Sequence, residues 1–456
     1  MLKKRIIAST LSLLLLSPLA QISNLPSVQA ATSSKNIIRV QGTNRFKTSI
    51  AIADKVVSDA TLDNVVLTSG YDFPDGLSGS TLAKKLNAPI LMAGNLSDSQ
   101  DALNYIYAHL KQNGNVYILG GTGAVSKDTE ETLKNKGYIV TRLAGQDRIG
   151  TNTSITESLN TPEGTPVFIA NAYSFPDALS VSSIAAINGY PILLTSTNTI
   201  SSSIKDDLSK IKPSTVYIVG GTGVVSSDVE NSIKALLPSS SIQRISGANR
   251  FETSMNVFTK FNLDTTNVVL ASGLDFPDAL SGSQLAAKLN ASIVLADENN
   301  LDAQQVNYTN KGITDFYILG GTGAVSGGAE ETINFDKDVE KANITSLLNT
   351  YSNAISQENI DLLMSTIYKN SSAYDQMKSF YEQHFAMEDE GNFKVTLSIE
   401  SFDFNSFTHN IADINVSEKA VRINNDGSTI SKTGTERLLL VKDNGKWYVV
   451  GSVIKS

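Results

Sequence analysis

The sequence predicts an α/β fold in which three tandem repeat domains, each with a parallel sheet, lie in a pseudo-threefold arrangement and precede a smaller α+β domain. Two observations predict the repeats: three short blocks recur about 100 residues apart, and apolar runs of strand length alternate with helical patterns between them. The recurring blocks then stop near residue 335, while the chain continues to residue 456. At roughly 100 to 200 residues per domain, the length agrees with several domains.

The repeats are defined by three blocks that keep their order and spacing. The first is Gly-x-Asn/Asp-Arg-Phe/Ile, the second is Phe-Pro-Asp, and the third is Tyr-Ile-Leu/Val-Gly-Gly-Thr-Gly. The first block begins at residues 42, 145 and 247. The second begins at residues 73, 175 and 276, and the third at residues 117, 217 and 317. Since solenoid repeats have roughly 20 to 50 residues, each longer unit is expected to be a small domain. We place the repeats at 37–139, 140–241 and 242–335.

Within the first repeat, short apolar runs rich in β-branched residues alternate with helical patterns. Strands are expected at 64–68, 89–92 and 116–119, and helices at 45–58, 74–86, 98–112 and 126–136. Strands that are apolar throughout and separated by helices indicate βα units on a parallel sheet with both faces covered.

A further strand lies at each boundary between repeats. Such strands are expected at Ile37–Val40, Val140–Leu143 and Ile242–Ile245, but no matching strand follows the third Gly-Gly-Thr-Gly block. We therefore expect Ile37–Val40 to complete the third repeat and to close the three repeats into a ring.

Composition excludes several kinds of site and partner. The chain has no cysteine, which excludes disulfides, thiolate zinc sites, iron–sulfur clusters and a cysteine nucleophile. Its 45 acidic and 37 basic side chains give a formal charge of −8, which argues against a nucleic-acid partner because phosphate neutralisation requires clustered bases. His109, His384 and His409 have no metal-ligand spacing, and no nucleophile-elbow motif is found. We expect no catalytic residue, no metal site and no cofactor.

Residues 1–30 are predicted to be a secretory signal peptide. Three bases at Lys3–Arg5 precede an apolar run, Ile6–Ala20, and Val28–Ala30 supplies a cleavage site. Cleavage would change the formal charge from −8 to −11, because it removes three bases and no acids. The apolar run is shorter than the roughly 20 residues that span a bilayer, so no membrane span is expected. We expect a secreted protein, and the absence of cysteine fits a Gram-positive surface.

The second and third blocks have structural explanations. Proline in the first helical turn and an aspartate beside it favour a helix N-terminus, so Phe-Pro-Asp is interpreted as a helix start rather than a catalytic carboxylate. Gly-Gly-Thr-Gly is typical of a tight strand-to-helix turn, with Ser126, Ser226 and Ser326 as helix N-caps. A nucleotide site at this turn is the alternative, although the turn lacks the lysine of a P-loop.

Arginines recur as pairs, six residues apart, once per repeat. Six of the eight arginines that follow the predicted signal peptide belong to these pairs: Arg39 and Arg45, Arg142 and Arg148, Arg244 and Arg250. A guanidinium group suits two-point contact with a carboxylate or a phosphate. Two interpretations stay open. The arginines form internal ion pairs, for instance with the Phe-Pro-Asp aspartates, or Arg45, Arg148 and Arg250 bind an external anion.

Together, the blocks, their spacing and the predicted signal peptide resemble the clostridial cell-wall-binding repeat family, type two, over residues 37–335. The resemblance implies a trimeric arrangement of α/β domains that holds the protein noncovalently on the cell wall through an anionic, teichoic-acid-like polymer. It also implies that an Ile-Leu-Leu motif takes part in polymer binding. The motif maps onto Ile90-Leu91-Met92, Ile192-Leu193-Leu194 and Ile293-Val294-Leu295. Only the second copy matches in full, and all three are also typical of buried strands that would act by shaping adjacent loops.

The C-terminal domain, 337–456, is predicted to be α+β. Helices are expected at 339–356, 359–368 and 374–384, and strands at 393–402, 408–416, 419–423, 436–442 and 446–454. Asp443-Asn444-Gly445-Lys446 predicts a hairpin turn. The element order and the closing Lys-Asp-Asn-Gly-Lys-Trp-Tyr-Val-Val resemble the nuclear transport factor two-like cone fold, which implies a sheet curled around a pocket. Phe402, Phe404 and Phe407 would line that pocket or fill the core.

These observations predict a secreted surface protein that three repeats attach noncovalently to an anionic polymer of a Gram-positive cell wall. The C-terminal domain would then be displayed as a ligand-binding or interaction domain whose partner the sequence leaves open. The final residues, Gly451–Ser456, contain no sorting motif, which agrees with noncovalent retention. The alternative is a cell-wall-modifying enzyme with its active site in the C-terminal pocket.

Overall fold

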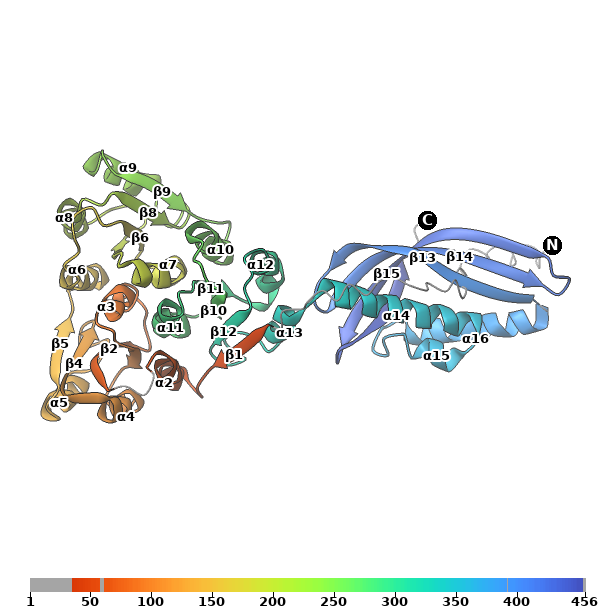
Figure 1. Cartoon of the computed structure of the whole chain (residues 1–456), viewed down its shortest axis with the longest axis horizontal. Helices are drawn as coiled ribbons and strands as arrows, with labels where there is room; N and C mark the ends of the chain where they lie inside the picture. Colours follow the sequence, from red (N-terminus) through yellow and green to blue (C-terminus); the bar gives the residue numbers. More distant parts are fainter. Residues whose placement is uncertain (1–34, 58–60, 392, 454–456) are drawn as a thin grey trace. The chain divides into compact units, whose positions relative to one another are not determined.

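The structure is a computed structural model that describes residues 35–57, 61–391 and 393–453. Its contacts divide the chain into a repeat unit, which ends at Ile333, and a C-terminal unit, which begins at Asn334 (Figure 1). The predicted signal peptide lies outside the described residues.

Each repeat contains a four-stranded parallel sheet, which confirms the predicted α/β class. In the first repeat the sheet order is β3-β2-β4-β5, and the strands are β2 (Leu62–Ser69), β3 (Ile90–Ala93), β4 (Leu110–Leu119) and β5 (Ile139–Leu143). Its helices are α2 (Arg45–Val56), α3 (Gly79–Lys85), α4 (Gln100–His109) and α5 (Lys127–Asn135). Alternate residues of β2 enter two cores, Val66 on one face and Val65 and Leu67 on the other, so both faces of the sheet are covered.

The second and third repeats copy this plan. The second has sheet order β7-β6-β8-β9, with β6 (Val167–Asn171), β7 (Ile192–Thr195), β8 (Thr215–Val219), β9 (Ser241–Ile245), α6 (Arg148–Ser158), α7 (Phe175–Asn188), α8 (Ser202–Ile211) and α9 (Ser227–Leu236). The third has sheet order β1-β12-β10-β11, with β1 (Asn36–Val40), β10 (Asn267–Ser272), β11 (Ile293–Ala296), β12 (Asp315–Leu319), α10 (Arg250–Phe261), α11 (Pro277–Lys288), α12 (Glu298–Asn310) and α13 (Gly328–Asn334).

The N-terminal strand closes the ring, as predicted. β1 pairs in parallel with β12, placing Arg39 opposite Ile318, and in the first repeat β5 places Arg142 opposite Ile118 in the same way. The sheet of the third repeat is therefore completed by a strand almost 280 residues away in the sequence. β5 and β9 likewise belong to the sheet of the repeat that precedes them.

One core joins the three repeats at the centre of this unit. Helices α3, α7 and α11 pack against one another there (Figure 1). The phenylalanines of the three Phe-Pro-Asp blocks form a cluster, in which the ring of Phe73 lies 5.5 Å from that of Phe175 and 5.9 Å from that of Phe276. Aromatic pairs at such distances add about 0.5 to 1.5 kcal/mol each to the effect of burial. The second block is thus the point where all three repeats meet.

Buried hydrogen bonds also connect the repeats. The Thr81 hydroxyl of the first repeat donates to the Tyr190 carbonyl of the second at 2.8 Å. The Gln284 side-chain amide of the third donates to the Ser80 carbonyl of the first at 2.8 Å. These bonds satisfy polar groups that the shared core would otherwise bury without partners.

The first repeat departs from the prediction at its Phe-Pro-Asp helix. We expect a helix from Pro74, but α3 spans only Gly79–Lys85. Gly76 stands where the other two repeats have alanine, and glycine is about 1 kcal/mol less favourable than alanine inside a helix. A Cβ at this position would lie 2.7 Å from Leu280 Cδ1 of the third repeat, so alanine there would require the Leu280 side chain to move.

The C-terminal unit has helices followed by one antiparallel sheet, which confirms the α+β class. Its helices are α14 (Lys337–Ser356), α15 (Ile360–Met364) and α16 (Tyr374–Gly391), and its strands, in the order of the sheet, are β13 (Phe393–Phe407), β14 (Ile411–Asn424), β15 (Thr429–Asp443) and β16 (Lys446–Val453). The predicted hairpin turn is present, with positive φ at Asn444 and Gly445, as a two-residue turn between twisted strands requires. Phe402, Phe404 and Phe407 pack against the core of this unit.

The two strands predicted at 408–416 and 419–423 are one continuous strand, β14. The prediction of a break at 417–418 was wrong, because Ile414, Val416, Glu418 and Ala420 alternate inward along β14 and are all buried. A carboxylic acid therefore occupies an interior position of the sheet.

Deletion of residues 31–41 tests ring closure. Removing β1 leaves the edge of β12 unpaired and exposes apolar surface now covered by Val40, so we expect the repeat unit to lose about 3 kcal/mol or more of its free energy of unfolding. Hydrogen exchange followed by mass spectrometry should show faster exchange in β12. A chain that begins at Lys35 keeps β1 and is the control. Unchanged exchange in β12 and unchanged cooperative unfolding would contradict closure by β1.

Candidate functional site

The candidate site lies where the central strands of the three sheets end. The loops 70–72, 172–174 and 273–275 follow β2, β6 and β10 and lead directly into the phenylalanine cluster. In open α/β sheets, ligands bind outside the carboxyl ends of the strands. We call these three loops, together with Arg45, Arg148 and Arg250, the axial face.

Local capping fixes the position of each of these arginines. Each is the first residue of a helix whose N-cap side chain, Asn44, Asp147 or Asn249, accepts a hydrogen bond from a backbone N–H of the first turn. The first block therefore places an arginine beside a strand end.

Each arginine of the axial face binds the loop of its own repeat. Nη1 donates to a loop carbonyl in every case: from Arg45 to Gly70 at 2.7 Å, from Arg148 to Ala172 at 3.0 Å, and from Arg250 to Gly273 at 2.6 Å. One nitrogen of each guanidinium group thus holds the loop of its own repeat.

Each arginine also contacts a phenylalanine of a different repeat. The guanidinium carbon of Arg45 lies 5.8 Å from the ring centroid of Phe276. That of Arg148 lies 5.8 Å from Phe73, and that of Arg250 lies 5.6 Å from Phe175. These cation–π contacts run once around the ring, so the axial face depends on closure.

Ion pairing differs among the three arginines. Arg45 Nη2 lies 3.2 Å from the carboxylate of Asp275, and both side chains are substantially exposed. For Arg148 and Arg250, no ion pair is found among the residues that the structure describes. An internal Arg–Asp pair therefore accounts for one of the three positions at most, and two guanidinium groups keep donors for an external anion.

The other arginine of each pair has a structural role. Arg142 donates to Glu130 at 2.8 Å and to the carbonyls of Gly120 and Gly121 at 2.8 and 3.0 Å, and its side chain is largely buried. The same contacts recur in the other repeats, from Arg39 to Glu330 and Gly320 and from Arg244 to Glu230 and Gly220. The internal ion pairs left open by the sequence are thus formed by these three arginines, with glutamates of α5, α9 and α13, the helices that follow the Gly-Gly-Thr-Gly turns.

The Phe-Pro-Asp aspartates lie against the Gly-Gly-Thr-Gly turns. A Cβ added to Gly120, Gly220 or Gly320 would lie 2.2, 2.4 or 2.1 Å from the carboxylate of Asp75, Asp177 or Asp278, and all three glycines have positive φ. The second and third blocks therefore recur together because they touch, and only glycine fits at the contact.

Burial changes the titration of these aspartates. It raises the pKa of Asp177 to about 6, against the lowering effect of Arg250. It likewise raises the pKa of Asp278 to about 6, an effect to which Asp275 adds and which Arg45 opposes. The arginines of the axial face are thus close enough to influence carboxylates of a neighbouring repeat.

The predicted helix N-caps are confirmed in two repeats. Ser126 Oγ accepts from Thr129 N at 3.2 Å, and Ser226 Oγ accepts from Val229 N at 3.5 Å. Ser326 Oγ has no hydrogen-bond partner among the described residues, and α13 begins only at Gly328, because two glycines follow this serine.

The Ile-Leu-Leu triplets lie inside the repeats. Ile90, Leu91, Met92, Ile192, Leu193, Leu194, Ile293, Val294 and Leu295 form β3, β7 and β11 and are at most 2% exposed. Side chains at this depth do not reach a ligand at the surface. Their contribution to polymer binding stays a prediction, and it would act through the loops that follow the strands.

Exposed apolar side chains complete the axial face. Tyr71, Tyr173 and Leu274 occupy equivalent positions, two residues before each Phe-Pro-Asp block, and are 58%, 60% and 68% exposed. The guanidinium group of Arg148 lies 4.7 Å from the ring centroid of Tyr173. Sequence reasoning missed these residues, although their fixed distance from the block was available as a signal. Cations beside exposed apolar groups suit a ligand with both phosphate and sugar-like parts.

The C-terminal unit contains a separate buried polar cluster. The hydroxyl groups of Tyr351 and Tyr381 lie 2.8 Å apart, and both residues are buried. Burial raises the pKa of Glu418 to about 9, and nearby Glu436 adds to this effect. His384 Nε2 lies 2.9 Å from the buried carboxylate of Glu388 on the same helix. Neither a metal-binding group of three or more acidic or histidine side chains nor a helix able to cross a membrane is found among the described residues.

Family models match both parts of the chain. The model of cell wall binding domain 2 (CWB2) matches residues 39–130, 142–230 and 244–330. A model of the anti-sigma-I factor RsgI9 C-terminal domain matches residues 346–456.

Known proteins similar to this chain share the repeats. The N-acetylmuramoyl-L-alanine amidase LytC of Bacillus subtilis is 35% identical over 304 residues, which are 66% of this chain and 58% of that protein. The amidase enhancer of the same organism is 30% identical over 297 residues, or 65% and 40% of the two chains. The solved structure of Cwp8 from Clostridium difficile has a TM-score of 0.59 and 27% identity, and the match covers 65% of this chain and 51% of that protein. The structure of Cwp6 from the same organism also has a TM-score of 0.59, with 26% identity, and the match covers 68% of this chain and 49% of that protein. The chain thus spans about half the length of these proteins.

Replacement of Glu418 by glutamine tests the buried acid. A folded-state pKa of about 9 against an ordinary value of 4.5 means that the folded chain retains a proton that the unfolded chain releases. Stability of this unit should therefore fall as pH rises from about 4.5 to 9. Glu418→Gln should flatten this dependence and, at pH 8, raise the free energy of unfolding by on the order of 2 kcal/mol.

Fluorescence of Trp447, the single tryptophan, reports unfolding of this unit within the full chain. Glu400→Gln replaces an exposed glutamate of the same sheet and is the matched control. A pH dependence that is the same for Glu418→Gln and for the unsubstituted chain would contradict the assignment.

Proposed function

Because the chain belongs to the cell wall binding domain 2 family, we propose that its three repeats attach it noncovalently to an anionic, teichoic-acid-like polymer of a Gram-positive cell wall. The observation that carries the proposal is the axial face, where Arg148 and Arg250 keep guanidinium donors beside exposed apolar side chains. The protein would be secreted and held at the cell surface.

Local charge, and not overall charge, has to support this attachment. The chain has a formal charge of −8, so its mean field repels a polyanion. The arginines of the axial face concentrate positive charge at one place, and their planar groups suit two-point contact with phosphate. Attachment should therefore weaken as ionic strength rises, since salt screens exposed charges.

The Ile-Leu-Leu strands support the site indirectly in this proposal. They pair directly with β2, β6 and β10, the strands that lead into the loops of the axial face. This pairing fixes the ends of β2, β6 and β10. The loop carbonyls that follow these strand ends accept the hydrogen bonds from the arginines.

The C-terminal unit is proposed to be the part that the repeats present at the surface. Its helices followed by a four-stranded antiparallel sheet agree with a fold like that of nuclear transport factor two. Ligand binding is its proposed role.

Wall modification by this unit is the second candidate, favoured by the protonated Glu418 near the Tyr351–Tyr381 pair. Release of soluble fragments from purified walls that ceases in Glu418→Gln would support the second candidate.

Sedimentation with purified walls tests the attachment. We expect the chain to co-sediment with intact Gram-positive walls and to stay in the supernatant after acid or hydrogen fluoride extraction of the anionic polymer. Binding should also decrease as sodium chloride is raised from low to high concentration. Equal binding to intact and to extracted walls would contradict an anionic receptor.

Charge reversal on the axial face tests the site. The triple variant Arg45→Glu, Arg148→Glu and Arg250→Glu should lose wall binding by a factor of ten or more, because each charge-assisted contact contributes about 1.5 to 3 kcal/mol. Circular dichroism and thermal unfolding should show a folded repeat unit.

A matched variant controls for net charge. Lys84, Lys205 and Lys260 are exposed on helices of the three repeats, and their replacement by glutamate makes the same change in net charge. We expect this control to retain most of its binding. Equal loss in both variants would show that only net charge matters, and loss of folding in the arginine variant alone would assign these arginines a structural role instead.

A further inference from the structure

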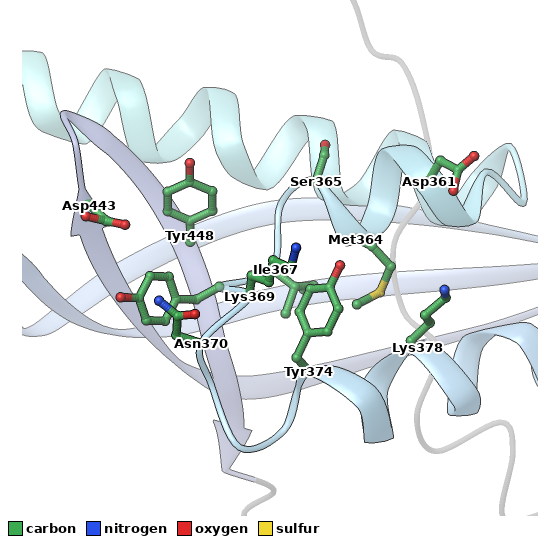
Figure 2. A pocket seen from close by; sticks show the side chains of 11 residues that line it. Asp361, Met364, Ser365, Ile367, Lys369, Asn370, Tyr374, Lys378, Asp443 and Tyr448 are labelled. Atoms are coloured by element: carbon green, nitrogen blue, oxygen red, sulfur yellow. The ribbon is translucent and has the colours of Figure 1, made fainter.

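The C-terminal unit has an open pocket that neither the repeats nor the buried cluster explains. Its volume is 580 Å³, within the range of roughly 300 to 1,000 Å³ that is usual for small-ligand sites. Four elements supply the walls: α15, the segment that follows it, the start of α16, and the hairpin of β15 and β16 (Figure 2). Nothing in the proposed wall attachment uses this pocket.

The floor of the pocket is apolar and its backbone is already paired. Met364 and Ile367 are buried beneath it. Tyr368 N donates to Val449 O at 2.8 Å, and Val449 N donates to Thr366 O at 2.9 Å. The strand edge at this place is thus occupied, so an extended peptide cannot bind by adding a strand.

Three tyrosines form the walls. Tyr368, Tyr374 and Tyr448 are each half-buried, and the ring centroids of Tyr368 and Tyr448 lie 6.0 Å apart with a tilt of 51°. Figure 2 shows Tyr374 and Tyr448 rising from different elements on either side of the pocket. Their hydroxyl groups make no hydrogen bond within the described part of the chain. Each tyrosine therefore offers a ring face together with a free polar end.

The charges around the pocket are balanced. Lys369 and Lys378 are opposed by Asp361 and Asp443. Asn370 and Ser365 add donors and acceptors at the exposed rim. A polyanion is not favoured by such a set, which distinguishes this pocket from the axial face.

We propose that this pocket binds a short oligosaccharide of N-acetylated amino sugars. Sugar rings present apolar C–H faces that pack on aromatic rings, which the tyrosines provide. Sugar hydroxyl groups need hydrogen-bond partners, which the tyrosine hydroxyl groups and the Asn370 amide provide. The apolar floor at Met364 and Ile367 accommodates an acetyl methyl group. The inference rests on the proposed function in one respect only, that a wall-attached chain is surrounded by amino-sugar glycan.

The test is an isothermal titration calorimetry experiment in which the full chain is titrated with chitotetraose, the β-linked tetramer of N-acetylglucosamine. We expect saturable binding to the unsubstituted chain. Tyr374→Ala and Tyr448→Ala should each weaken it by roughly tenfold or more, since each removes an aromatic wall. Tyr374→Phe keeps the ring and removes the hydroxyl group, so it should weaken binding less than Tyr374→Ala. Tyr107→Ala removes an exposed tyrosine from the repeats and should have no effect.

Two further arms make the outcome decisive. The charge-reversed axial-face variant should bind chitotetraose normally, so failure of wall attachment and failure of the pocket are distinguished. A soluble stem peptide of peptidoglycan is the competing ligand. The proposal would be overturned if the chain bound only the peptide, or if it bound neither probe. It would also be overturned if Tyr374→Ala and Tyr448→Ala, with unchanged thermal unfolding, bound chitotetraose as well as the unsubstituted chain does.

Discussion

The pairing of β1 with β12 is the constraint on which the repeat unit depends. In the first two repeats the fourth strand of the sheet comes from beyond the Gly-Gly-Thr-Gly turn, whereas in the third repeat the N-terminal strand β1 takes this place. Once that strand is in place, Arg39 reaches Glu330 and the turn at Gly320 as its equivalents do elsewhere. Closure then brings the three Phe-Pro-Asp blocks to one point, where their rings and three guanidinium groups alternate. The candidate site is therefore a product of the ring and not of any single repeat.

The two arginines of each pair have different roles, one structural and one as a candidate binding group. Arg142 is largely buried and all of its guanidinium nitrogens have partners, so its contribution is to hold the turn after β4. Arg148 uses one nitrogen for a loop carbonyl and is left with others at a partly exposed position. Buried charges need complete partners, whereas a binding group needs an incomplete set. All six arginines recur, so recurrence does not distinguish their roles. Burial and hydrogen-bond pairing do distinguish the structural arginines from the candidate binding arginines.

Much of the fold could be predicted because the chain repeats itself. Recurrence at constant spacing predicted three α/β repeats, and the absence of a strand after the third turn predicted the role of Ile37–Val40. What could not be predicted are contacts between blocks that are far apart in sequence, such as Asp177 against Gly220. The continuity of β14 could not be predicted for a related reason. Burial raises the pKa of Glu418 to about 9 and so favours its neutral form inside the sheet, an effect of tertiary packing that local pattern does not reveal.

Three equivalent positions around one axis also explain how an acidic chain could hold an acidic polymer. A single arginine contact is weak in salt and competes with a repulsive mean field. In the proposed attachment, three contacts on one rigid ring would bind the same polymer. Once the first contact has formed, the other two would form at a high effective concentration, so most of the entropic cost of association would arise only once. The positions are not identical, because Arg45 is partly neutralised by Asp275, whereas Arg250 is exposed and free of ion pairs among the described residues. Attachment through this face would therefore rest most on the second and third repeats, and the first repeat, which also has the shortened α3, would contribute chiefly to closing the ring.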